Sequence, residues 1–183
     1  LGTVEFLVDV EREEFYFLEM NARVQVEHPV TEEVTGLDLI ALQIAIAEGR
    51  PLTLTQNDIH ITGHAIECRL NAEDIANGFM PSPGRVTEAW FPSLPGMRVD
   101  THMQPGAMIP PHYDSMVAKL ITHGATRAEA IARMQTALRV MRLDGVKTNA
   151  ALHARIMADP GFVAGGVDTT YLPDLLSRME PAS

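Results

Sequence analysis

Apolar and polar residues alternate in two neighbouring stretches at the start of the chain. Residues 3–9 (TVEFLVD) and 14–21 (EFYFLEMN) have the two-residue period of β-strands, and the charged residues between them suit a turn. The pattern predicts a β-hairpin. Phe17 and Glu19 are expected to share one face of the second strand, and pairing across the turn would bring Glu19 close to Glu5.

The apolar spacing then changes to that of helices. Residues 30–35 predict a short helix, and the stretch after it predicts a longer one with Asp38 as its N-cap and Gly49 directly after its end. Residues 51–58 are polar and irregular, so we place a domain boundary there. Residues 1–57 form the first predicted part of the chain and residues 58–183 the second.

The second part is expected to be mainly β as far as residue 124. Residues 60–74 and 116–124 alternate like strands, and the turn-rich stretch 79–96 holds a short strand. The connections between these strands are short, which favours antiparallel pairing. Together with the helices, these strands predict an α+β fold.

Helical patterns close the chain. One helix is predicted to begin with a capping box at Thr126 and Glu129 and to end at Gly145. A second is predicted from an N-cap at Thr148 to Pro160, because proline cannot continue a helix. The tail after residue 168 predicts a last short helix that frays towards the C-terminus.

Composition narrows the class of protein. The chain of 183 residues is 46% hydrophobic and 21% charged, which suits a soluble globular protein, and no apolar run approaches the roughly 20 residues of a membrane helix. Acidic residues outnumber lysine and arginine 24 to 14, which argues against non-specific nucleic-acid binding. The lone Cys68 can form no internal disulfide, so a reducing compartment is expected.

The start of the sequence gives less information about the class of protein. The first residues have neither the basic region nor the cleavage site of a signal peptide. The chain opens inside a predicted strand and without an initiator Met. We therefore expect it to be a piece of a longer protein.

Every second residue is polar in a row that starts in the second strand: Glu19, Asn21, Arg23, Gln25 and Glu27. A fully extended chain would place all five on one face and separate the ends of the row by about 26 Å, at ~3.3 Å per residue. One small ligand cannot touch both ends. Either the chain bends within the row or the row serves two neighbouring sites.

The first end of the row has the chemistry of a metal site. Close carboxylates of Glu5 and Glu19 would repel each other unless a cation neutralised them, and Asn21 adds an amide oxygen. Magnesium binds such oxygens and often bridges them to phosphate. Two solvated glutamates on an exposed strand are the alternative interpretation.

The other end of the row suits a small anion. Arg23 stays charged at any working pH, and its planar fork matches bicarbonate, a carboxylate or phosphate. A salt bridge from Arg23 to Glu19 or Glu27 is the alternative. Gln25 adds a neutral donor and acceptor, and Glu27 has the chemistry of a general base.

Longer motifs resemble one enzyme family. The stretch EFL, followed by FYFLEMNARVQVEHPVTEEVTGLDL, is similar to the end of the ATP-grasp domain of biotin carboxylases. GHAIECRLNAED, PSPG and PPHYDSMVAKLI resemble the C-terminal domain that follows in the same family. E-x-N-x-R alone is shared with carbamoyl-phosphate synthetases, whereas R-x-Q-x-E-H-P-V-T-E with G-H-A-x-E-C-R is specific. The resemblance covers essentially the whole chain.

The resemblance implies roles for the metal end of the row. Glu5 and Glu19 match the family's ligands for Mg²⁺ or Mn²⁺ bound with ATP, and Asn21 matches a further residue of the same metal–phosphate site. Leu7, in the matching EFL, falls where the family packs against the nucleotide.

The resemblance also implies roles at the bicarbonate end. Arg23, Gln25 and the backbone of Val26 match the bicarbonate-binding residues, and Glu27 matches the proposed base that deprotonates bicarbonate. Arg69 in ECR matches the arginine that stabilises the enolate of biotin. From its position alone, Arg69 would be interpreted as an ordinary strand arginine.

The family resemblance further implies a fold, a reaction and partners. The fold is the C-terminal portion of an ATP-grasp domain followed by a mainly antiparallel, barrel-sandwich-like domain with terminal helices. The reaction uses ATP and bicarbonate to make carboxyphosphate and carboxylates biotin carried on another protein or domain. A carboxyltransferase and a second copy of the enzyme are implied partners, in the cytoplasm or, for a eukaryotic protein, the mitochondrial matrix.

The same resemblance implies that the lysines and glycine-rich lid that hold ATP lie outside these 183 residues. The piece alone is therefore expected to be inactive. Two other functions stay open: a non-catalytic dimerisation or docking module, and an ATP-grasp ligase with a different acceptor.

Overall fold

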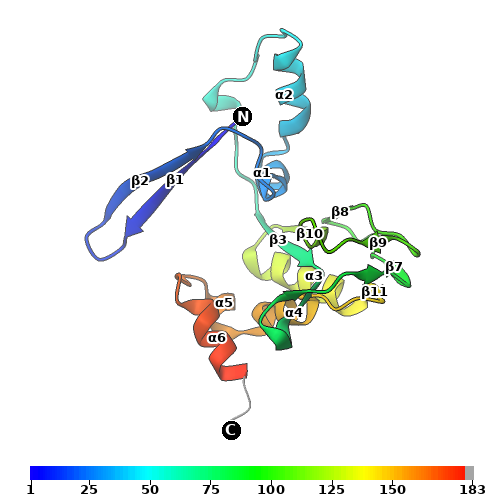
Figure 1. Cartoon of the computed structure of the whole chain (residues 1–183). Helices are drawn as coiled ribbons and strands as arrows, with labels where there is room; N and C mark the ends of the chain where they lie inside the picture. Colours follow the sequence, from blue (N-terminus) through cyan, green and yellow to red (C-terminus); the bar gives the residue numbers. More distant parts are fainter. Residues whose placement is uncertain (180–183) are drawn as a thin grey trace.

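A computed structural model describes residues 1–179 and has an α+β architecture (Figure 1). Its strand pairs are antiparallel. The hairpin and the first helices form the upper part in Figure 1, and the remaining sheets and helices form the lower part. Within the described residues, no helix has the length and apolar character needed to cross a membrane. The end of the predicted fraying tail, residues 180–183, lies outside the described part.

The predicted hairpin is confirmed. β1 (Thr3–Asp9) pairs with β2 (Glu14–Asn21), and Glu5 lies opposite Glu19. The register shifts directly after Glu5, so that Phe6 pairs with Phe17. The Phe6 and Phe17 ring centroids are 6.2 Å apart. The expectation that Phe17 shares a face with Glu19 is therefore wrong, because this irregularity in the pairing breaks the strict alternation.

The polar row does not continue as a strand. β2 ends at Asn21, the chain bends at Arg23, and a turn at Val26 and Glu27 leads into α1 (His28–Thr35). Of the two possibilities that the sequence left open, the chain takes the bend. Pro29 lies in the first turn of α1, where its missing N–H costs no helical hydrogen bond.

The second predicted helix is confirmed as α2 (Leu39–Ala47). Its N-cap is Asp38, whose Oδ1 accepts a hydrogen bond from the Ala41 N–H at 2.7 Å, and Gly49 follows the end with a φ of +85°. None of the residues of α2 is buried. The linker after it contains one short 3₁₀ turn, η1 (Gln56–Asp58).

The second part of the chain is built around a three-stranded sheet in the order β3–β10–β8. Its strands are β3 (His64–Asn71), β10 (Met116–Gly124) and β8 (Met97–Thr101). Two-stranded pairs and a 3₁₀ turn surround it: β4 (Glu73–Asp74), η2 (Ile75–Asn77), β5 (Met80–Pro81), β6 (Gly84–Arg85), β7 (Glu88–Trp90), β9 (Met108–Ile109) and β11 (Arg142–Asp144). One face of the main sheet, with Cys68, Leu70 and Leu120, packs into the hydrophobic core.

The helix α3 (Arg127–Val140) covers this core. Thr126 caps it as predicted, and Glu129 accepts a hydrogen bond from the Ala125 N–H at 2.8 Å. The predicted end at Gly145 is wrong, because residues 142–144 leave the helix and form β11 against β7. Leu143 is buried in this pairing, which offsets the loss of helical hydrogen bonds.

The last helices are α4 (Ala150–Ala158), α5 (Pro160–Ala164) and α6 (Tyr171–Met179). The N-cap of α4 is Asn149, so the predicted cap at Thr148 is wrong by one residue. The side chain of Asn149 makes no hydrogen bond to its own helix. Its Oδ1 accepts from the Asn71 N–H at 3.0 Å and its Nδ2 donates to the Arg69 carbonyl at 3.1 Å, which ties α4 to β3.

Candidate functional site

The hairpin brings the predicted metal residues together. The Nδ2 of Asn21 donates to Glu5 Oε1 at 2.9 Å and to Glu19 Oε1 at 3.0 Å. Within residues 1–179 no cluster of three or more His, Cys, Asp or Glu side chains is placed to hold a metal. Two carboxylates that converge on one point nevertheless fit Mg²⁺, since that ion takes its other ligands from water and phosphate. Leu7 lies further along β1 and is 61% exposed.

The bend brings Gln25 of the polar row to the first strand of the hairpin. The Nε2 of Gln25 donates to Glu5 Oε1 at 3.0 Å, so a residue predicted at the anion end contacts a residue predicted at the metal end. Arg23 is exposed, and its guanidinium donates to the Val24 carbonyl at 3.2 Å. In the described part of the chain Arg23 pairs with neither Glu19 nor Glu27, so its guanidinium is open to an anion from solution.

A charged sheet face lies against the row. The register of β3, β10 and β8 places Arg69 opposite Lys119 and Lys119 opposite Asp100, so these three residues cross the sheet in one line. The same face packs on α1, the helix that directly follows the row. The β-sheet of the second part thus forms one wall beside the turn at Val26 and Glu27.

Two contacts join this wall to the row. Arg69 Nη2 lies 3.7 Å from Glu27 Oε2, and both side chains are about half exposed. Lys119 Nζ donates to the Val26 carbonyl at 3.2 Å and lies 3.2 Å from Asp100 Oδ2. Glu27 and Arg69, which lie 42 positions apart in the sequence, are therefore neighbours across the two parts of the chain.

The charged network continues towards α1. Arg98 donates to Asp100 from Nε at 2.8 Å and from Nη2 at 2.9 Å, and its Nη1 donates to Glu32 Oε2 at 2.6 Å. Burial raises the pKa of Asp100, but the hydrogen bonds from Arg98 and Lys119 outweigh burial and hold that pKa below its usual value. These pairs keep the Asp100 carboxylate ionised.

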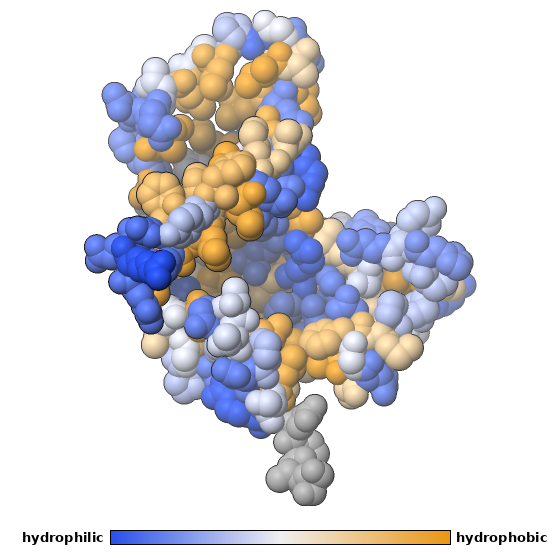
Figure 2. Space-filling view, turned by 60° about the vertical axis from the view of Figure 1, so that its left-hand side comes forward, coloured by the Kyte–Doolittle hydropathy of each residue, from blue (hydrophilic) through white to orange (hydrophobic). Residues whose placement is uncertain are grey.

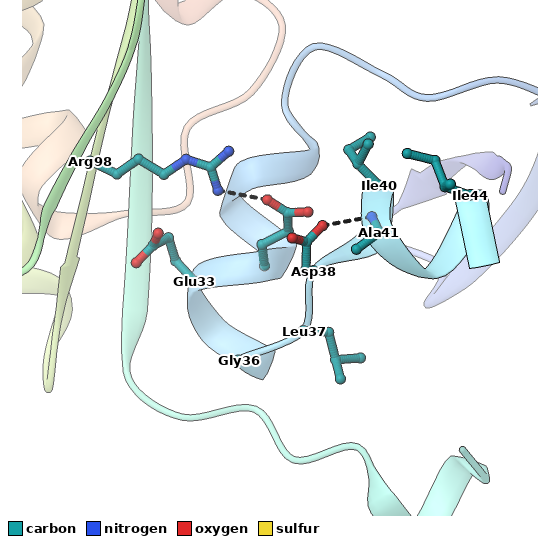
Figure 3. A pocket seen from close by; sticks show the side chains of 9 residues that line it. Glu33, Gly36, Leu37, Asp38, Ile40, Ala41, Ile44 and Arg98 are labelled. Carbon is teal, nitrogen blue, oxygen red and sulfur yellow. Dashed lines mark hydrogen bonds and ion pairs between the residues drawn. The ribbon is translucent and has the colours of Figure 1, made fainter. Parts of the chain in front are cut away.

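A cavity of about 660 Å³ opens where this network reaches α1 and α2 (Figure 3). Figure 3 shows Arg98 pointing towards α1 and Asp38 turned to the backbone of Ala41. Glu32 closes the contact between the two helices, because its Oε1 accepts from the Leu39 N–H at 2.7 Å. The cavity holds none of the residues that the sequence predicted to act on a substrate.

Glu67 is the unusual titratable group of the sheet face. Burial raises the pKa of its carboxyl to about 7, although the positive charges of Lys119 and Arg69 act in the opposite direction. Its Oε2 atom is buried and has no hydrogen-bond partner among residues 1–179. Sequence reasoning singled out neither Glu67 nor Lys119. The one available signal was the lysine within the apolar run MVAKLI.

Comparison with known families explains the combination of hairpin, bent row and charged sheet. Residues 1–55 match the family described as the carbamoyl-phosphate synthase L chain, ATP binding domain. Residues 67–174 match the family described as the biotin carboxylase C-terminal domain. The chain belongs to the biotin carboxylase family. The resemblance that the motifs predicted is therefore confirmed.

Individual relatives agree with this assignment to the biotin carboxylases. The chain is 53% identical to the biotin carboxylase of Allochromatium vinosum over 175 residues, which cover 96% of this chain and 38% of that protein. It is 52% identical to the biotin carboxylase of Haemophilus influenzae over 179 residues, which cover 98% of this chain and 39% of the relative. The chain thus spans about two fifths of the length of these relatives.

Solved structures confirm the α+β fold. The biotin carboxylase domain dimer of Hydrogenobacter thermophilus 2-oxoglutarate carboxylase superposes with a TM-score of 0.94 at 43% identity, over 100% of this chain and 40% of that one. That structure was determined in complex with MgADP, ADP and bicarbonate. Rhizobium etli pyruvate carboxylase superposes with a TM-score of 0.93 at 36% identity, over 100% of this chain and 19% of that one.

Proposed function

We propose that this chain forms the C-terminal part of a biotin carboxylase, which uses ATP and bicarbonate to carboxylate biotin on a carrier protein through carboxyphosphate. The observation that carries the proposal is the contact of 3.7 Å between Glu27 and Arg69. It joins a base from the bent row to a cation from the C-terminal sheet. Bicarbonate and biotin must meet at such a junction if one base and one oxyanion-stabilising arginine serve the same reaction.

The bicarbonate end of the site has the groups that this chemistry needs. Among the described residues the Arg23 guanidinium forms no ion pair, and it would bind the anion together with Gln25 and the backbone of Val26. Glu27 is exposed at its side-chain tip, where it can accept a proton from bound bicarbonate. The charge of Arg69 is suited to the enolate oxygen that develops on biotin during the reaction.

The hairpin end supplies the cation and nucleotide contacts of the proposal. Glu5 and Glu19 would hold Mg²⁺ or Mn²⁺, and Leu7 would pack against ATP. The amide nitrogen of Asn21 donates to both glutamates, so the amide would have to turn over for its oxygen to bind the cation. The bound cation would neutralise phosphate charge. The relative from Hydrogenobacter thermophilus, with its MgADP and bicarbonate, supports this set of ligands.

The same proposal includes the partners, the assembly and the compartment of the enzyme. Biotin would arrive on a separate carrier protein or domain, and a carboxyltransferase would use the product. A homodimer is the proposed assembly, supported by the dimer of the Hydrogenobacter thermophilus relative. A reducing compartment, the cytoplasm or the mitochondrial matrix, suits the free and buried Cys68. We also propose the barrel-sandwich description for the small sheets of residues 58–183.

A graft tests the function. The homologous segment of a full-length biotin carboxylase is replaced by these 183 residues, and bicarbonate-dependent ATP cleavage is measured with and without biotin. We expect cleavage that requires bicarbonate and carboxybiotin formation that requires biotin. The isolated 183-residue chain is the control and should turn over no biotin.

The same assay separates the two other functions. ATP cleavage that biotin does not influence would favour a ligase with a different acceptor. A folded graft that cleaves no ATP would contradict the proposal and favour a non-catalytic docking module. Folding of the graft is checked by circular dichroism and by gel filtration.

A further inference from the structure

Lys119 is a buried cation in the centre of the main sheet. Its side chain is 11% exposed, although lysine is among the residues least often buried without a partner. It lies on β10, between Arg69 of β3 and Asp100 of β8, on the face that packs against α1. Burying an ammonium group without partners is costly, so the Lys119 ammonium is expected to bind neighbouring groups.

Asp100 alone does not account for the ammonium. Arg98 already binds both carboxylate oxygens of Asp100, at 2.8 and 2.9 Å, in the fork geometry that suits a carboxylate. The charge of Asp100 would therefore stay neutralised without Lys119. What Lys119 adds is a hydrogen bond of 3.2 Å to the Val26 carbonyl, which belongs to a part of the chain 93 residues away.

That carbonyl lies in the peptide that leads directly to Glu27. The backbone around it is a turn between the bend at Arg23 and the start of α1, so no strand ladder fixes it. Arg69 holds the Glu27 carboxylate only loosely, at 3.7 Å and with both side chains about half exposed. The Arg98–Glu32 pair holds α1 on the same sheet face, and the Lys119 hydrogen bond is the buried contact made by the turn itself.

We propose that Lys119 is a positioning residue for bicarbonate: it holds the Val26–Glu27 peptide on the C-terminal sheet and so places the Glu27 carboxylate and the anion-binding backbone beside Arg69. This inference rests on the proposed function. Lys119 touches no substrate in this scheme. Because β10 is the central strand of the sheet, a hydrogen bond from Lys119 keeps the distance between Glu27 and Arg69 fixed.

The test uses a full-length biotin carboxylase that carries these 183 residues. Lys119→Met keeps the apolar stem and removes the ammonium. We expect the KM for bicarbonate to rise about tenfold or more, because the turn at Val26 and Glu27 is displaced. The KM for MgATP should change less than about twofold, because the hairpin residues stay in place. Exchange of the Glu27 and His28 amides with solvent should also become faster.

A matched variant controls for the loss of a lysine. Lys147→Met removes an ammonium that pairs with Asp74 at the surface of the same domain, with 64% of the Lys147 side chain exposed. It should leave both KM values and the exchange of the turn unchanged. Lys119→Gln is prepared beside Lys119→Met, because it keeps a donor in the strand and provides a folded variant if the methionine is not tolerated. Its KM for bicarbonate should rise less than that of a folded Lys119→Met.

Three results decide the matter. A wild-type graft that cleaves no ATP overturns the proposed function and this inference with it. A working graft in which folded Lys119 variants keep the wild-type KM for bicarbonate overturns the positioning role alone. A fall in kcat with equal changes in both KM values also overturns it, because that pattern is expected of a general structural defect.

Discussion

The hairpin β1–β2 and the sheet β3–β10–β8 have the same kind of sequence and very different surroundings. Strands of both were predicted from alternating positions in the sequence. In β10 the residues from Val117 to Thr122 are all buried, whereas in β2 Phe15 is 71% and Phe17 64% exposed. Figure 2 shows hydrophobic residues at the surface of the upper part of the molecule, where the N-terminal elements lie. Alternation therefore predicts a strand but not whether its apolar face is covered.

The difference has consequences for stability and for the site. The sheet packs its apolar face on α3 and its charged face on α1, so the second part of the chain builds its own core. The hairpin holds two glutamates of the proposed site on a two-stranded ribbon that is marginally stable by itself. We infer that the sheet supplies the fixed side of the site and the hairpin the adaptable side.

Amide hydrogen exchange on the 183-residue chain should reveal this difference most strongly. Amides in β10, such as that of Leu120, should open only with global unfolding, while those in β2, such as that of Phe17, should exchange through local opening. We expect protection factors to differ by about 10³ or more, which corresponds to roughly 4 kcal/mol. Equal protection in the two strands would mean that hairpin and sheet unfold together, contrary to our comparison.

Truncating one large apolar side chain in each region is the next test. Leu120 is fully buried in the core, so Leu120→Ala should lower the free energy of unfolding by about 3 kcal/mol. Phe17→Ala removes a larger side chain, but an exposed one, and should change the free energy of unfolding by less than about 0.5 kcal/mol. Urea unfolding followed by circular dichroism measures both. A loss of several kcal/mol in the Phe17 variant would contradict the marginal hairpin.

The same comparison explains what could be predicted from the sequence. Local signals were sufficient for the limits of β10, for the Asp38 cap and for the hairpin, because each depends on a few neighbouring residues. The irregular pairing after Glu5 was missed, since cross-strand pairing decides it. β11 was missed as well. The sequence has a helical pattern there, but burial of Leu143 against β7 stabilises a strand instead.

Some residues of the candidate site could likewise be predicted from the sequence and others could not. Glu27 and Arg69 were found through motifs, and the structure brings them together. Lys119 and Glu67 were missed, because burial and the register of three strands determine their surroundings. The contact of Gln25 with Glu5 could not be predicted either, since it depends on the direction of the bend at Arg23.

Glu67 makes the stability of the charged sheet face depend on pH. Burial raises the pKa of its carboxyl to about 7, above the ordinary value of 4.5. Between these values the folded state binds more protons at this group than the unfolded state does. The Glu67 contribution therefore destabilises the fold progressively as the pH rises from 4.5 to 7.

Glu67→Gln should remove this contribution. The group is only half-buried and solvent screens its charge, so we expect the variant to be about 1 kcal/mol more stable than wild type at pH 8 and equally stable near pH 4.5. Urea unfolding from pH 4.5 to pH 8 measures the difference between the two curves. Parallel curves across this range would show that Glu67 titrates normally.

The smallest expected effect compares two helix caps. Thr126 caps α3, which has five buried residues, and Asp38 caps α2, which has none. Thr126→Ala should lower the free energy of unfolding by about 1 kcal/mol, because α3 unfolds with the core. Asp38→Ala loses a shorter hydrogen bond, 2.7 Å against 3.2 Å, yet should leave that free energy unchanged and only speed amide exchange within α2. If Asp38→Ala were as destabilising as Thr126→Ala, α2 would belong to the same cooperative unit as the sheet. The less stable region would then be limited to the hairpin.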